Sequence, residues 1–183
     1  MILGRDKILA ALASGAIVCE PAPDAVEATH IDLHLGRWYY RPRSRIARVD
    51  AASTDPHACY DLCDAERTSG VIVPGYALVL AHTVEIAGTT VPALLPTIET
   101  RSTLARWGLA AHISAGYGDP GYCSRWTLEL YNHHAWPIAL PIGARIACIT
   151  FHEVDGNDVL YAARYNTRGA WQPSDMLPRR RNV

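Results

Sequence analysis

From residue 31 onward the chain is divided into short runs of alternating apolar and polar residues, and glycine or proline separates most of them. Alternation with a period of two is typical of strands that are buried on one face. The runs that predict strands are 31–40, 69–73, 76–86, 110–114, 124–132, 137–140 and 145–152. Many short strands favour a mainly β fold, a distorted β-barrel or jelly roll with a few short helices. We find no internal repeat and expect a single domain spanning residues 1–183.

Three segments lie outside this pattern. Residues 5–15 predict an amphipathic opening helix that ends at Gly15. Residues 43–65 have little periodicity and are expected to form a surface excursion. Residues 161–183 are expected to be a weakly structured C-terminal segment, and the three arginines near its end are typical of a solvated terminus.

A short helix with an anion-binding start is predicted within residues 100–109. Thr100 or Ser102 can cap the helix, and Gly108 ends it. Free backbone N–H groups at a helix start favour a phosphate. The side chains that would add hydrogen bonds or positive charge there are Arg101, Ser102, Thr103 and Arg106.

Glu129 lies in the middle of an otherwise apolar strand. It alternates with Leu128 and Leu130 and therefore points to the opposite face. A carboxylate in such a strand costs energy unless it is solvated, paired or used in function. A functional role for Glu129 therefore stands beside a solvated strand face and an ion pair with Arg125. Asp119, in a Gly-Asp-Pro-Gly turn, is by itself typical of a turn.

Composition excludes several classes of protein. Seventeen basic residues against 18 acidic residues argue against a nucleic-acid partner. The N-terminus does not resemble a signal peptide, and no apolar run reaches the roughly 18 residues of a membrane span. Five irregularly spaced cysteines predict no disulfide framework, and Cys59 and Cys63 lack Cys-x-x-Cys spacing. We expect a soluble cytoplasmic protein without a membrane partner.

Three sequence blocks, in this order, resemble the dCTP deaminase family within the trimeric dUTPase superfamily. The blocks are RSTLARWGL at 101–109, SAGYGDPGY at 114–122 and TLELYN at 127–132. Residues 28–36, 74–80, 83–85 and 141–147 extend the likeness over nearly the whole chain. The resemblance implies a dUTPase-type fold and an enzyme of deoxynucleotide metabolism that converts dCTP to dUTP and ammonia.

The resemblance also implies roles for individual residues. Glu129 would take a proton from water near C4 of cytosine and return it to the base or the leaving ammonia, with Ser102 and Arg106 beside it in the catalytic site. The implied substrate-binding residues are Arg101 and Thr103 for phosphate, Ala115, Gly116 and Tyr117 for the base edge, Asp119 and Tyr122 for the deoxyribose, and Arg168 and Gln172 from a C-terminal segment, 161–183, that closes over the nucleotide.

Cofactor and assembly follow from the same resemblance. Mg²⁺ would bind together with the triphosphate. Zinc-dependent base deaminases carry His-x-Glu and Pro-Cys-x-x-Cys, and neither motif occurs in this sequence, so no zinc is expected. The family builds its sites between subunits of a homotrimer. Ser102 and Arg106 would then meet Glu129 of a neighbouring chain.

Three alternatives remain open. Gly116-Tyr117 resembles the branch in which deamination is coupled to diphosphate release, so a bifunctional enzyme could take dCTP to dUMP with Asp119 activating water. A dUTPase is the second alternative, although we find no glycine-rich C-terminal phosphate motif. The third is a nucleotide-sensing or protein-binding relative that keeps the pocket without turnover.

Overall fold

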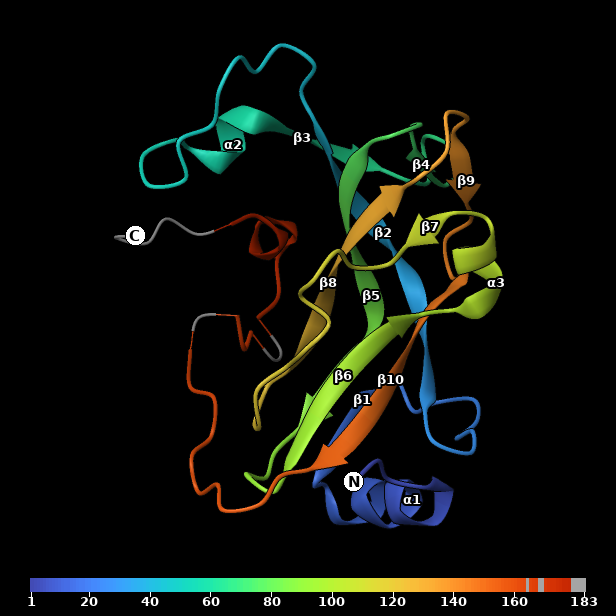
Figure 1. Cartoon of the computed structure of the whole chain (residues 1–183), viewed down its shortest axis with the longest axis vertical. Coiled ribbons are helices and arrows are strands. Elements are labelled where there is room, and N and C mark those ends of the chain that lie inside the picture. Colours follow the sequence, from blue (N-terminus) through green and yellow to red (C-terminus); the bar gives the residue numbers. More distant parts are fainter. Residues whose placement is uncertain (164, 168–169, 179–183) are drawn as a thin grey trace.

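The computed structural model describes residues 1–163, 165–167 and 170–178 (Figure 1). The strands are β1 (Ile17–Glu20), β2 (Ile31–Pro42), β3 (Tyr60–Asp64), β4 (Val71–Val73), β5 (Leu78–Thr89), β6 (Leu94–Thr100), β7 (Leu109–Ala110), β8 (Cys123–Asn132), β9 (Ile138–Leu140) and β10 (Arg145–Glu153). The helices are α1 (Arg5–Ser14), α2 (Pro56–Cys59), α3 (Ser102–Arg106) and the 3-10 helix η1 (Pro173–Met176). Among the described residues no helix is long and apolar enough to cross a membrane.

Eight strands form one sheet in the order β6-β10-β2-β5-β8-β7, with β1 paired to β5 and β3 paired to β2. Strands β4 and β9 form a separate pair. A bridge between Thr97 of β6 and Tyr117, ahead of β8, draws the two ends of the sheet together. The result is a nearly closed antiparallel barrel, which confirms the mainly β prediction.

Alternation along β8 decides which side chains reach the barrel core. Trp126, Leu128 and Leu130 are buried inside, and burial of apolar side chains of this size is worth about 1.5–3 kcal/mol each. The residue between the two leucines, Glu129, is only half-buried and faces outward. The core therefore fixes the register that presents Glu129 on the outer face.

The C-terminal segment docks against that outer face. Met176 and Leu177 are buried against Tyr40 of β2 and Leu80 of β5. Upstream, the Tyr161 backbone N–H donates to the Pro120 carbonyl at 2.7 Å. The described part of 161–178 has little regular structure, as predicted, but its contacts hold it on the barrel beside β8 (Figure 1).

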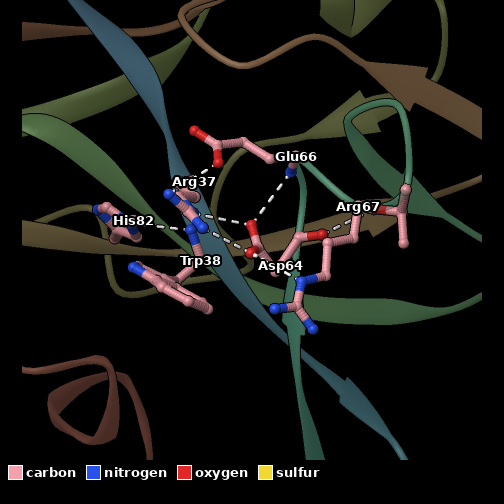
Figure 2. A network of polar contacts seen from close by, with 7 residues as sticks. Arg37, Trp38, Asp64, Glu66, Arg67 and His82 are labelled. Carbon is pink, nitrogen blue, oxygen red and sulfur yellow. Dashed lines mark hydrogen bonds and ion pairs between the residues drawn. The ribbon is translucent and has the colours of Figure 1, made fainter.

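A polar network joins β2, β3 and β5 (Figure 2). Arg37 donates from Nε and Nη2 to Asp64 at 2.8 and 2.7 Å, and this hydrogen bonding lowers the pKa of Asp64. His82 accepts from the Trp38 N–H through Nε2 at 3.2 Å, and its Nδ1 lies 2.8 Å from the Thr83 carbonyl. Nδ1 therefore carries the proton, and the ring is held neutral.

Three strands, β1, β3 and β6, were not predicted, and the predicted strand 110–114 is wrong except at Ala110, where it overlaps β7. Pro96 disguises β6. The carbonyl of Pro96 and the N–H of Ile98 bond to loop residues Gly118 and Gly116, so the proline nitrogen faces away from β10 and no bond to β10 is lost. The predicted excursion 43–65 contains α2 and β3, and β3 pairs with β2.

Candidate active site

A cavity of about 650 Å³ lies between the outer face of the sheet, loop 113–122 and the C-terminal segment. Five of the predicted site residues line it: Ala115, Tyr117, Asp119, Tyr122 and Glu129. The cavity falls within the range of about 300–1,000 Å³ that is typical of small-molecule sites. The structure therefore brings the predicted catalytic carboxylate together with the predicted base and sugar residues.

The Glu129 carboxylate is oriented by the loop between β7 and β8. Its Oε2 accepts a hydrogen bond from the Ile113 backbone N–H at 3.1 Å. Arg125 instead donates to the Thr83 carbonyl at 3.3 Å, and its guanidinium lies 5.7 Å from the Trp171 ring centre. The alternative of an Arg125–Glu129 ion pair is therefore wrong, and Glu129 remains directed to the cavity.

The turn that follows the loop presents Asp119 and Tyr122. The Tyr122 N–H donates to the Asp119 carbonyl at 2.9 Å, and Gly121 has a φ of +89°, which suits glycine. The Tyr122 ring packs edge-on against Trp126 and Tyr161, with centroid distances of 4.8 and 5.8 Å. Burial raises the pKa of Tyr122, so its hydroxyl stays neutral. A rigid aromatic wall results, which is suited to packing against a sugar.

Gly116 supports the cavity without lining it. Its carbonyl accepts from the Ile98 N–H at 2.7 Å, and a Cβ at this position would lie 2.7 Å from the His112 ring. His112 Nε2 is 3.7 Å from the exposed Glu99 carboxylate. Within the described part of the chain its buried Nδ1 has no hydrogen-bond partner. Gly116 is therefore required for packing, and it does not line the cavity.

Helix α3 does not line the cavity of its own chain. It lies on the side of the barrel away from η1 (Figure 1), and Ser102, Thr103 and Arg106 are exposed. Arg101 is the N-cap residue, and its Nη1 donates to Asp32 Oδ1 at 2.6 Å. The predicted caps are wrong: no side-chain cap bond forms, and the Thr100 hydroxyl accepts from the Ala111 N–H. Gly108 follows the helix with a φ of +74°, as predicted.

The C-terminal segment lines the cavity through Tyr161, which lies at the start of the segment expected to close over the nucleotide. It also supplies cavity residues that the sequence did not indicate, namely Tyr165, Asp175, Met176, Leu177 and Pro178. Gln172, predicted to bind substrate, forms a capping box with Asp175, in which the Gln172 N–H donates to Asp175 Oδ2 at 2.8 Å. Arg168, the other predicted residue, lies outside the described residues.

The cavity is acidic. Asp119, Glu129 and Asp175 line it, and no lysine or arginine does so among the described residues. A nucleotide triphosphate would therefore need positive charge from elsewhere. The described residues also contain no group of three or more His, Cys, Asp or Glu side chains that could hold a metal ion.

Tyr60, at the start of β3, also lines the cavity and was missed. It lies in the stretch that was interpreted as a surface excursion. Two signals in the sequence could have placed Tyr60. The first is Asp55-Pro56, which predicts a helix start; in the structure α2 begins there, and the Asp55 side chain accepts from the His57 N–H. The second is the alternation of residues 60–64, which predicts a strand.

A family model described as dCTP deaminase-like matches residues 2–154. A dUMP-forming dCTP deaminase from Dictyoglomus thermophilum is 31% identical over 159 residues, which cover 84% of this chain and 81% of that protein. A dCTP deaminase from Halorubrum lacusprofundi is 35% identical over 160 residues, covering 84% and 78% of the two chains.

Solved structures of two other proteins have a fold similar to that of this chain. The 2'-deoxycytidine 5'-triphosphate deaminase from Agrobacterium tumefaciens has a TM-score of 0.60 at 20% identity, and the match covers 82% of this chain but only 46% of that one. The EIAV dUTPase has a TM-score of 0.51 at 15% identity over 81% and 95% of the two chains. At these identities the likeness concerns the fold alone. The family model and the relatives above 30% identity lead to one conclusion: the chain belongs to the dCTP deaminase-like family.

Proposed function

We propose that this protein catalyses the hydrolytic deamination of dCTP to dUTP and ammonia. The observation that carries the proposal is the position of Glu129, an oriented carboxylate in a cavity with Ala115, Tyr117, Asp119 and Tyr122. Family membership supplies the substrate class, and relatives named dCTP deaminase support it.

In the proposed reaction Glu129 accepts a proton from a water molecule beside C4 of the cytosine. The oxygen of that water bonds to C4, and Glu129 passes the proton it took to the ring nitrogen N3. Glu129 then takes the second proton from the new C4 hydroxyl, as C4=O forms, and passes it to the amine. The C4–N bond breaks, and the amine departs as ammonia. One water is consumed for each ammonia released, and the carboxylate is regenerated.

The sugar and base contacts follow from the walls of the cavity. Asp119 would accept a hydrogen bond from the 3′-hydroxyl, and the Tyr122 ring would pack on the deoxyribose. Backbone groups of residues 115–117 would read the Watson–Crick edge of the base. These contacts would hold C4 over the Glu129 carboxylate, and positioning of this kind can supply several kcal/mol of the barrier reduction.

The triphosphate requires cations that the cavity does not supply from the described residues of its own chain. We propose that α3 of a neighbouring subunit supplies them, with Ser102, Thr103 and Arg106 exposed for this role and Arg101 holding the start of the helix. A homotrimer with sites between subunits would meet this need. Mg²⁺ would enter with the triphosphate and be held mainly by phosphate oxygens.

A second candidate is a coupled reaction that ends at dUMP. Asp119 lines the same cavity as Glu129, so a second water could be activated there. The relative from Dictyoglomus thermophilum is named dUMP-forming. In this reaction dCTP and two waters give dUMP, ammonia and diphosphate.

Incubation of the purified protein with dCTP and with dUTP, separately and with Mg²⁺, tests the proposal. Ammonia is measured and the nucleotides are resolved by anion exchange. We expect dCTP to give one ammonia for each uracil nucleotide formed, with dUTP as product. Accumulation of dUMP and diphosphate would favour the coupled reaction. Tight nucleotide binding without ammonia would contradict deamination and favour a sensing role.

A further inference from the structure

Tyr60 stands between two cavities. Besides the cavity that holds Glu129, it lines a second cavity of about 230 Å³. The second cavity is formed largely by apolar residues of the predicted excursion, among them Ile46, Val49 and Cys59. Among the residues that the structure describes, Pro178 is the other one that borders both cavities. Removal of the Tyr60 ring would therefore join the two spaces.

The position of Tyr60 is fixed by its surroundings. It pairs with Pro42 in the β2–β3 ladder, and Arg43 and Asp61 form an ion pair at 2.8 Å beside it. Its ring packs edge-on against Tyr40, with the centroids 6.4 Å apart. Tyr60 also packs against the cluster that contains Leu80 and Met176. Burial, with a smaller contribution from the Glu129 charge, raises the pKa of Tyr60, so the phenol is neutral at physiological pH.

The order of strands places Tyr60 opposite the loop that would read the base. Across the sheet, Glu129 of β8 lies beside Leu80 of β5, and Leu80 lies beside Tyr40 of β2. Strand β3 follows on that side: its Leu62 pairs with Tyr40, and Tyr60 lies two residues away, opposite Pro42. Strand β7 and the loop whose Ile113 N–H bonds Glu129 lie on the other side of β8. The cavity therefore has loop 113–117 on one flank of Glu129 and Tyr60 on the other flank.

This arrangement determines which edge of a cytosine would face Tyr60. In a cytosine, C4 lies between N3 and C5. If C4 is held at Glu129 and the N3 side faces loop 113–117, the C5 edge must face the opposite flank. We propose that Tyr60 is a specificity-determining residue that packs against the C5 edge of the nucleobase and excludes large C5 substituents. This inference rests on the proposed deamination, and it adds which nucleobases the site excludes, namely those with large C5 substituents.

The test compares dCTP with 5-propynyl-dCTP, whose apolar substituent suits the second cavity. The kcat/KM ratio of the two substrates is measured for the wild type, Tyr60→Ala, Tyr60→Phe and Leu62→Ala. Leu62 lies two residues along the same strand and is 47% exposed, and it lines neither cavity. Because the electronic effect of the substituent is the same in every variant, changes in the ratio report the shape of the site.

We expect Tyr60→Ala to raise the relative kcat/KM for 5-propynyl-dCTP by about 10-fold or more, which is the scale of steric discrimination in apolar pockets. Tyr60→Phe and Leu62→Ala should keep the wild-type ratio. If the wild type converts dCTP but Tyr60→Ala leaves the ratio unchanged, the assignment of Tyr60 is overturned and deamination stands. If the wild type neither binds nor converts dCTP, both proposals are overturned.

Discussion

The polar side chains on the outer face of β5 and β8 have two different roles. Glu129 faces a cavity, and its only described hydrogen bond comes from a loop N–H. His82, two residues from Leu80 on the neighbouring strand, is 5% exposed and is covered by the Trp171 ring at a centroid distance of 4.4 Å. A Cβ at Gly36 would overlap the His82 ring, so glycine is needed there. We interpret His82 as a structural residue and Glu129 as a reactive one.

The structural role of His82 predicts a pH dependence of stability. Burial lowers its pKa from 6.5 to about 4, because desolvation disfavours the imidazolium. Between these values the unfolded chain binds a proton that the folded protein does not, so the free energy of unfolding falls as the pH decreases. The contribution of His82 is complete above pH 6.5 and lost by about pH 4, a change of about 3 kcal/mol.

Urea unfolding of the wild type and His82→Gln at about pH 7 and about pH 4.5 measures this contribution. Other groups titrate equally in both proteins, so the difference between them isolates His82. We expect the wild type to lose more stability on acidification than the variant. Equal losses in the two proteins would show that His82 does not carry the effect.

At the scale of elements, the sequence predicted those marked by a local signal, such as a stop residue or a complete alternation. Helix α1 ends at Gly15, which has a φ of +77°, and β8 matches the predicted alternation within one residue. Strand β6 was missed because Pro96 interrupts the strand pattern, although its nitrogen faces away from β10. Strand β3 was missed because it is only five residues long and depends on pairing with β2.

The candidate site was predictable to the extent that its residues lie in recognisable blocks. Residues 114–122 and 127–132 gave Asp119, Tyr122 and Glu129, which share the cavity. The resemblance indicated that the C-terminal segment would reach the nucleotide, but the residues that dock it, Met176 and Leu177, make tertiary contacts that no local pattern encodes. Tyr60 reaches the cavity through the same kind of long-range contact.

At the scale of the whole molecule, the separation of α3 from the cavity makes a prediction about assembly. If α3 of one subunit serves Glu129 of another, two inactive variants should rescue one another. Chains carrying Arg106→Ala and chains carrying Glu129→Gln, co-refolded in equal amounts, would form some interfaces with both halves intact. With random assembly, about half of the sites have an intact α3, and about half of those also have an intact Glu129, so about one quarter of the wild-type rate should be restored.

Dilution of each variant with wild-type chains controls for subunit exchange, and native mass spectrometry verifies the mixed oligomers. Absence of recovered activity in verified mixed oligomers would show that each site is built within one chain. Full activity of a monomer would lead to the same conclusion.

The central claim is that the Glu129 carboxylate carries protons during deamination of dCTP, and ammonia release by Glu129→Gln tests it most directly. The amide keeps the shape of the side chain but cannot take up the proton of water, so we expect kcat to fall by about 10² to 10⁴. Calorimetric binding of dCTP should stay near the wild-type value. Glu27→Gln, an exposed carboxylate outside the cavity, should retain full activity. Near-normal ammonia release by Glu129→Gln would contradict the account.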